Sequence, residues 1–260
     1  MLLAIDIGNT NITLGVYARA GDPADPEHRW RIATDHDRTA DEYAMVLLSF
    51  FAHAGRAPKE VTGVAIASVV PPLTSVFTAV SRDYFGREAL VVDAGIRTGV
   101  RVRYDNPREV GADRVADAAA AHRLYGGPAC IVDFGTGTTF DAISAEGDYL
   151  GGAIAPGIGI AAEALFARTA KLPRVNLARP PSVIGSNSVH SMQSGLVFGY
   201  VSLVEGMVAR FKRELGPATK VIGTGGLVDL MAEETQVIEI IDPWLTLKGL
   251  RIIYDLNRPA

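Results

Sequence analysis

Two segments of the chain pair an aspartate with a glycine-containing polar turn, a combination that suits polyphosphate binding. In "LAIDIGNTNITLGV", Asp6 closes an apolar run and Gly8 follows two residues later. In "ACIVDFGTGTTFDAI", Asp133 and Gly135 repeat that spacing 127 residues further on (133 − 6 = 127). Glycine lets backbone amides approach an oxyanion closely, and carboxylates suit the cations that accompany a polyphosphate. The repeat therefore predicts two phosphate-binding turns, with the alternative that each aspartate only caps its own turn.

The recurrence of this hairpin at the start of each half predicts two similar domains with a nucleotide cleft between them. We place the boundary between residues 114 and 115, giving domains 1–114 and 115–260. The segment "GTGG", Gly223 to Gly226, would offer a flat glycine surface for the adenosine. The alternation of strand and helix patterns predicts mixed α/β domains.

Apolar periodicity predicts the elements that position these turns. Strand patterns cover residues 2–7, 11–18, 29–34, 61–70, 89–93, 99–104 and 129–143. The segment 129–143 includes a turn, and the segment 220–231 begins with a further strand. Helix patterns cover 39–54, 73–85, an alanine-rich stretch ending at Tyr125, 187–215 and 246–257. The segment "GDPADPE" predicts a turn-forming insertion after the second strand.

Composition excludes several classes of function. The 260 residues are 48% hydrophobic and carry a formal net charge of −4 without a long basic run, so we expect neither a nucleic-acid nor a membrane partner. The locally basic stretch has Arg101 and Arg103 on one strand face, which is either solvated or a site for anionic groups. Gly195 and Gly199 have GxxxG spacing, but Ser202 and Glu205 interrupt that apolar run, which favours close helix packing.

Cysteine, histidine and N-terminal patterns point to a cytoplasmic protein without a transition-metal site. Cys130 is the single cysteine, which fits a reducing compartment and a buried core position. The five histidines have no zinc-ligand spacing, and the N-terminus has no export pattern. The sequence contains no GxxxxGK[ST] motif, and the GxGxxA match from Gly157 to Ala162 follows no first βα turn, so it favours helix packing or a substrate loop.

Taken together, the motifs resemble the type III pantothenate kinases of the actin, sugar-kinase and Hsp70 superfamily. The resemblance rests on "DIGNTN", "RIATDHDRTADEY", "SVVPPLT", "YDNPREVGADR", "DFGTGTTFD", "GGAIAPGI", "SMQSG" and "GTGG", which extend over nearly the whole chain. It implies two ribonuclease H-like (actin-like ATPase) domains with mixed sheets. It also implies phosphorylation of pantothenate by ATP with Mg²⁺, the first step of coenzyme A biosynthesis, in a homodimer activated by a monovalent cation, K⁺ or NH₄⁺.

The resemblance also assigns residues to roles. It implies that ATP is bound by Asp6, Ile7, Gly8, Asn9, Thr10, Asn11, Ile12, Thr13 and Thr136, and that Asp133 holds the monovalent cation. It implies that pantothenate is bound by Tyr104, Gly111, Ala112, Asp113, Arg114 and Ser188, with Asp113 as the proton acceptor. Ser188 stands where the family commonly has threonine, so the hydroxyl is kept and a methyl contact is lost.

Ordinary structural roles compete with several of these assignments. Asp113 opens the alanine-rich helix, where the helix dipole favours a negative charge. Arg114 would either pair with a carboxylate or phosphate or lie on the helix surface. Tyr104 would either contact substrate or be a half-buried strand residue. Asn187 and Ser188 fit a helix N-cap equally well. Another kinase or a polyphosphate hydrolase of the superfamily, and a regulatory protein of the same fold, remain as alternative functions.

Overall fold

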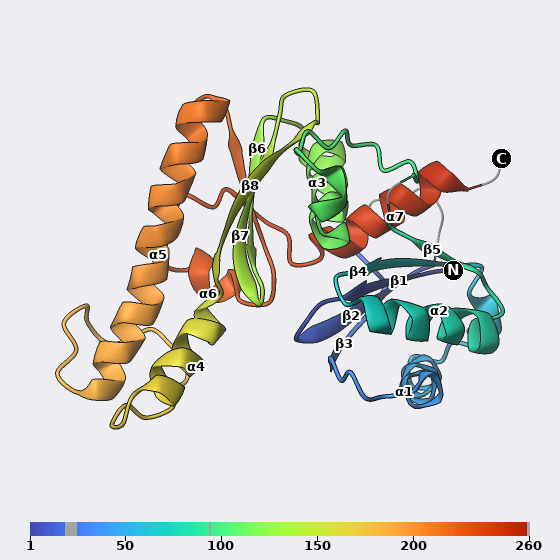
Figure 1. Ribbon diagram of the computed structural model, residues 1–260, viewed down its shortest axis with the longest axis horizontal. Helices are drawn as coiled ribbons and strands as arrows, with labels where there is room; N and C mark the ends of the chain where they lie inside the picture. Colours follow the sequence, from blue (N-terminus) through green and yellow to red (C-terminus); the bar gives the residue numbers. More distant parts are fainter. Residues whose placement is uncertain (19–24, 94, 259–260) are drawn as a thin grey trace. The chain divides into compact units, whose positions relative to one another are not determined.

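The protein, seen in a computed structural model that describes residues 1–18, 25–93 and 95–258, contains two compact units (Figure 1). Unit 1 comprises Met1–Tyr125 together with Trp244–Ala260, and unit 2 comprises Gly126–Pro243. The chain therefore leaves unit 1 once and returns to it near its end. Most of the predicted segment "GDPADPE" lies outside the described residues.

The sheet of unit 1 has five strands in the order β3-β2-β1-β4-β5. Strands β1 and β2 form an antiparallel hairpin, β3 extends this meander, and β4 and β5 run parallel to β1. The bounds are β1 (Leu2–Ile7), β2 (Asn11–Tyr17), β3 (His28–Ala33), β4 (Gly63–Ser68) and β5 (Ala89–Val91). The predictions for 2–7, 11–18 and 29–34 are confirmed to within one residue at each end.

Helices cover both faces of this sheet (Figure 1). Helices α1 (Ala40–His53) and α2 (Pro71–Phe85) pack with alternate strand residues in one core, which includes Leu3, Ile5 and Ile7. Helices α3 (Ala112–Tyr125) and α7 (Leu245–Asn257) pack against each other and against β1 and β4. Because strand side chains alternate between faces, Asp6 points to the face opposite the core of α1 and α2.

The sheet of unit 2 repeats the topology of unit 1, with the order β10-β9-β6-β7-β8. Strands β6 and β7 form the antiparallel hairpin, β8 continues the meander, and β9 and β10 lie on the parallel side. The bounds are β6 (Ala129–Phe134), β7 (Gly137–Ile143), β8 (Tyr149–Pro156), β9 (Lys220–Thr224) and β10 (Ile240–Ile241). The prediction of two similar α/β halves, made from the repeated hairpin, is confirmed at the level of sheet topology.

Helix α5 (Ser188–Leu215) covers the core face of this second sheet together with α6 (Val228–Ala232), and α4 (Ile158–Arg168) packs against α5 (Figure 1). By length and composition alone, α5 is apolar enough to cross a membrane. It contributes Leu196, Val204 and Val208 to the buried core of unit 2, so its composition does not indicate a membrane protein. A Cβ at Gly195 or Gly199 would meet nothing within 4 Å, so these glycines are not at a tight contact among the described residues.

Two features differ from the sequence predictions. The strand predicted for 99–104 is wrong, because only Val102 forms an isolated bridge and the flanking Arg101, Arg103 and Tyr104 are exposed. An alternating pattern gives a strand only where a neighbouring strand pairs with it and one face is buried. The compact units are also not divided at 114 and 115, because α3 and α7 pack together on the first sheet. The functional domain division 1–114 and 115–260 stays a prediction.

Candidate active site

The first predicted turn connects β1 to β2 in unit 1. Its backbone is closed by the Gly8 amide, which donates to the Asn11 carbonyl at 3.0 Å. Asp6 pairs in register with Thr13 on β2 and with Ala67 on β4, so its carboxylate lies over the carboxyl end of the parallel pair. Ligand sites of open α/β sheets form at this edge, outside the carboxyl ends of the strands.

The helix start that contains Asp113 lies at the same edge and on the same face as Asp6. The Val69 amide, just after β4, donates to the Ile7 carbonyl at 3.1 Å, and a Cβ on Gly111 would lie 3.2 Å from Val69 Cγ1. Asp113 is therefore brought towards the end of β1 from a position more than 100 residues away in sequence. The prediction that both groups belong to one site has this geometric support within unit 1.

The carboxylate of Asp113 is held in a defined orientation. Its Oδ1 accepts a hydrogen bond from the Arg114 amide at 2.8 Å, and the helix begins with the Val115 amide donating to the Gly111 carbonyl at 3.1 Å. A Cβ on Gly111 would overlap Asp113 Oδ1, so any larger residue there would displace the carboxylate. The sequence "GAD" thus couples a glycine to an oriented acid at a helix N-terminus.

The second turn, in unit 2, has the same organisation. Asp133 is the penultimate residue of β6, as Asp6 is of β1, and it pairs with Thr139 on β7 and Thr224 on β9. A Cβ on Gly225 would overlap Asp133 Oδ1, and one on Gly135 would lie 3.3 Å from Asp133 Oδ2. Two glycines therefore form a cradle for this carboxylate. Gly225 also has a φ of +92°, a conformation that glycine adopts without strain.

A buried polar network continues from this turn along β7. Asp141 is fully buried and accepts hydrogen bonds from Thr139 Oγ1 at 3.0 Å and from Tyr149 Oη at 2.8 Å. Because Thr139 is the cross-strand neighbour of Asp133, this network fixes one of the side chains beside the predicted cation ligand. The sequence alone predicts no role for Asp141.

Two further residues predicted to bind substrate, Tyr104 and Ser188, belong to different units. Tyr104 is 37% exposed in the irregular segment before α3, whereas Ser188 is the first residue of α5 in unit 2. Asn187 is the N-cap of α5, since its side chain accepts a hydrogen bond from the His190 amide at 2.9 Å. The capping alternative is confirmed for Asn187, and the substrate role of Ser188 stays a prediction.

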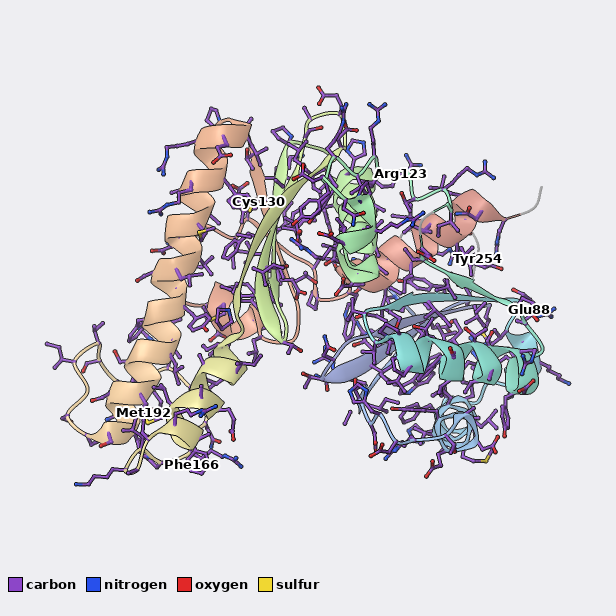
Figure 2. All side chains as sticks on the ribbon, in the orientation of Figure 1. Glu88, Arg123, Cys130, Phe166, Met192 and Tyr254 are labelled. Atoms are coloured by element: carbon purple, nitrogen blue, oxygen red, sulfur yellow. The ribbon has the colours of Figure 1, made fainter. Side chains whose placement is uncertain are left out.

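Cys130 is buried, and the described histidines belong to no metal-binding cluster. Cys130 lies on β6 in the sheet of unit 2 (Figure 2), and burial, aided by the negative charge of Asp141, raises the pKa of its thiol to about 12. The thiol is therefore protonated at neutral pH, and its burial confirms the predicted core position. Within the described part of the chain, no group of three His, Cys, Asp or Glu side chains could hold a metal ion.

Two residues outside the predicted set contact the turns. Thr34 follows β3 and bonds to the first turn, and Gly157 follows β8 and bonds to the second. Both residues lie in motifs that carry the family resemblance, "RIATDHDRTADEY" and "GGAIAPGI". Their contacts with the turns are non-local, so no spacing rule predicts them.

Comparison with known proteins assigns the chain to one family. The family model for type III pantothenate kinase matches residues 2–210. The chain is 52% identical over 257 residues to the type III pantothenate kinase of Moorella thermoacetica, covering 99% of this chain and 100% of that protein. It is 54% identical over 258 residues to that of a Roseiflexus species, with the same coverage.

Solved structures share the fold at much lower sequence identity. A Campylobacter jejuni protein assigned to the Baf family of transcriptional activators has a TM-score of 0.61 at 18% identity, covering 96% of each chain. A Sinorhizobium meliloti protein assigned as a 2-dehydro-3-deoxygalactonokinase has a TM-score of 0.57 at 13% identity, covering 100% of this chain and 98% of the other. These likenesses show the fold, that of actin-like and sugar-kinase ATPases, which confirms the predicted fold class.

Proposed function

Because the chain belongs to the type III pantothenate kinase family, we propose that its two acid–glycine turns hold ATP while Asp113 serves the acceptor hydroxyl. The protein is a kinase that phosphorylates pantothenate with ATP, the first step of coenzyme A biosynthesis. The observation that carries the proposal is the repeated hairpin, which sets Asp6 and Asp133 at equivalent positions of two sheets with the same topology.

In this proposal, the backbone of Asp6 to Thr13 and the Thr136 side chain bind the phosphates. The kinase uses ATP with a divalent metal, which neutralises phosphate charge, and we propose Mg²⁺. Asp6 suits this ion, because Mg²⁺ takes oxygen ligands and is bound through one or two carboxylates plus substrate phosphates. The GTGG segment after β9 would face the adenosine.

Asp133 is our proposed ligand for a monovalent cation, K⁺ or NH₄⁺. The support is the cradle formed by Gly135 and Gly225, which holds the carboxylate at the end of β6 with backbone close on two sides. Carboxylate and carbonyl oxygens are ligands that hard cations prefer. Such an ion beside the second turn would add positive charge where the transferred phosphoryl group needs it.

Asp113 is our proposed proton acceptor. The pantothenate hydroxyl oxygen attacks the γ-phosphorus, the bond from that phosphorus to the bridging oxygen breaks, and ADP leaves. A carboxylate is too weak a base to remove the alcohol proton beforehand, so Asp113 orients the hydroxyl and takes its proton as the new bond forms. Tyr104, Gly111, Ala112, Arg114 and Ser188 would bind the rest of pantothenate, with the Arg114 guanidinium suited to an anionic group.

We further propose a cytoplasmic homodimer without a nucleic-acid or membrane partner. Support for the dimer comes from exposed apolar side chains on unit 2, from α4 through the start of α5 (Figure 2 labels Phe166 there). The exposed set is Ile160, Leu165, Phe166, Val183, Ile184 and Val189. Large exposed apolar patches on a protein surface commonly mark interaction sites. The single buried cysteine suits a reducing compartment.

The test is phosphoryl transfer from ATP to pantothenate with purified protein, with and without K⁺, detected as 4′-phosphopantothenate. We expect product that depends on pantothenate and Mg²⁺ and increases when K⁺ replaces a large organic cation at equal ionic strength. Acetate and hexose acceptors form the control. Transfer to those acceptors but not to pantothenate would contradict the proposed acceptor, whereas equal rates without K⁺ would contradict only the cation.

A further inference from the structure

The residue immediately after the third strand of each sheet contacts the glycine turn of the same unit. In unit 1, Thr34 follows β3, and its amide donates to the Thr10 carbonyl at 3.0 Å. In unit 2, Gly157 follows β8, and its amide donates to the Thr136 carbonyl at 3.1 Å. The third strand therefore ends in both units on a hydrogen bond to the turn that we propose for phosphate binding.

In unit 1 the contact has a second bond. Thr34 Oγ1 donates to the Gly8 carbonyl at 2.6 Å, so one residue holds the carbonyls of both Gly8 and Thr10. The peptide that joins Gly8 to Asn9 is planar, and in a trans peptide the N–H points opposite to the C=O. Fixing the Gly8 carbonyl towards Thr34 therefore turns the Asn9 amide away from Thr34, where it can serve as a donor to an anion.

Unit 2 achieves the same contact by close approach of the backbone. A Cβ on Gly157 would overlap the Thr136 carbonyl oxygen and would lie 2.7 Å from the Gly135 carbonyl oxygen. No side chain fits between residue 157 and the turn. The two units thus support equivalent turns in different ways, through a threonine hydroxyl in one and through a glycine backbone in the other.

In each unit, the hydroxyl of a buried or half-buried tyrosine bonds to the backbone of the residue next to Thr34 or Gly157. Tyr43 of α1 is fully buried, and its hydroxyl accepts from the Asp35 amide at 3.0 Å and donates to the Asp35 carbonyl at 2.8 Å. Tyr200 of α5 donates to the Pro156 carbonyl at 2.8 Å. The residue beside Thr34 and the residue beside Gly157 are therefore tied to the hydrophobic core of their own unit.

We propose that Thr34 and Gly157 are positioning residues that preset the two turns for the triphosphate of a nucleotide. This inference rests on the proposed function, in which those turns bind phosphate. Preset amides need not reorganise when an anion binds, so their contribution appears as phosphate affinity. The proposal also gives a physical role to the segments "RIATDHDRTADEY" and "GGAIAPGI", to which we assign no contact with ATP or pantothenate.

The test compares Thr34→Val, which removes the hydroxyl but keeps the shape, with Thr34→Ser, which keeps the hydroxyl. Binding of the non-hydrolysable analogue AMPPNP with Mg²⁺, and of adenosine, is measured by calorimetry on the full chain. We expect Thr34→Val to weaken AMPPNP binding about tenfold and to leave adenosine binding unchanged, as loss of one hydrogen bond would. Thr34→Ser should restore AMPPNP affinity to within about twofold of the parent.

Thr62→Val is the matched control. Thr62 Oγ1 also donates to a backbone carbonyl, that of Met1 at 3.1 Å, but at the opposite end of β1. This variant should keep full AMPPNP affinity, and the KM for pantothenate should stay unchanged in both valine variants. A general loss of stability would instead lower the affinities for AMPPNP and adenosine together and would shift the thermal midpoint.

The outcomes separate this inference from the proposed function. A folded Thr34→Val protein that binds AMPPNP as tightly as the parent, while the parent phosphorylates pantothenate, overturns the inference alone. A selective loss of AMPPNP affinity in a protein that transfers no phosphoryl group to pantothenate would support the inference and contradict the acceptor. Gly157→Ala gives a second test, since the added methyl must displace the second turn and should also weaken AMPPNP more than adenosine.

Discussion

At the scale of single residues, the structure holds the proposed base in one orientation. The Arg114 amide bonds to Asp113 Oδ1, and Gly111 leaves room for that carboxylate. A group positioned in this way needs little reorganisation to accept a proton during phosphoryl transfer. Its contribution should therefore appear in turnover more than in binding.

We predict that Asp113→Asn lowers kcat for pantothenate phosphorylation by about two or more powers of ten, because the amide cannot accept the proton. Asp41→Asn is the control, since Asp41 also lies in the first turn of a 14-residue helix. That variant should keep near-parental kcat. A folded Asp113→Asn protein with comparable turnover would remove Asp113 from the role of base.

A second residue-scale prediction concerns the cradle of Asp133. Gly225→Ala should destabilise the fold by about 2–4 kcal/mol, because it combines backbone strain with overlap of the carboxylate. It should also abolish activation by K⁺. Gly86→Ala shares the positive φ, but its Cβ would meet nothing within 4 Å, so only the strain of about 1 kcal/mol remains.

Denaturant unfolding and the K⁺ dependence of the rate measure these two effects. If Gly225→Ala keeps the parental response to K⁺, the carboxylate of Asp133 is not the cation ligand that we propose. If Gly225→Ala and Gly86→Ala destabilise the fold equally, the overlap between the Cβ at position 225 and Asp133 is relieved without a cost in free energy.

At the scale of elements, α3 depends on α7 for its position. The two helices approach so closely that a Cβ on Gly249 would overlap the carbonyl oxygen of Ala116. Ala116 lies one turn after Asp113 on α3, so this contact also supports the start of the helix. Gly249 has no side chain and Ala116 has a small one, which allows the close approach.

We predict that Gly249→Ala destabilises the protein by about 1–3 kcal/mol, because the methyl group must force the helices apart. It should also lower kcat through the displaced helix start. Gly206→Ala on α5 is the matched control, since its nearest neighbour is the mobile end of Arg210 at 3.3 Å. Alanine there should be neutral or stabilising by up to about 1 kcal/mol, as helix propensity dictates. Equal unfolding midpoints for the two variants would contradict the tight contact.

The sequence predicts elements well where pattern and local chemistry agree. Both hairpins emerge from apolar runs that end at Asp6 and Asp133, and Thr39 caps the start of α1 in a capping box with Glu42. The strand β8 has no such signal, because its Gly151, Gly152 and Pro156 resemble a loop and only pairing with β7 makes it a strand. The contacts of Thr34 and Gly157 are likewise set by tertiary packing, so spacing alone could not predict them.

At the scale of the whole molecule, one sheet topology appears twice and carries different additions. Unit 1 supplies the helix start with Asp113, while unit 2 supplies the cradle of Asp133 and the exposed apolar residues from α4 through the start of α5. The shared sheet topology accounts for the paired turns, and the additions to each unit account for the separate roles that we propose. We propose that unit 2 carries the surface through which subunits associate.

We predict that the protein sediments as a dimer and that Ile184→Glu shifts it towards monomer, because Ile184 is 86% exposed within the apolar set. A charge buried in an apolar interface is costly. Met45→Glu is the control, since Met45 is 54% exposed on unit 1. Sedimentation velocity at several concentrations measures both variants. Monomeric parent protein, or an Ile184→Glu dimer as tight as the parent, would contradict the assigned surface.

The return of the chain to unit 1 at Trp244 has a consequence for biosynthesis. As the protein emerges from the ribosome, residues 126–243 are complete before α7 has been translated, although unit 1 began first. Until then, α3 and the first sheet lack the helix α7 that packs against them, so the surface that α7 buries stays uncovered. The proposed catalytic helix start therefore gains its supporting contact with Gly249 only after unit 2 has been translated.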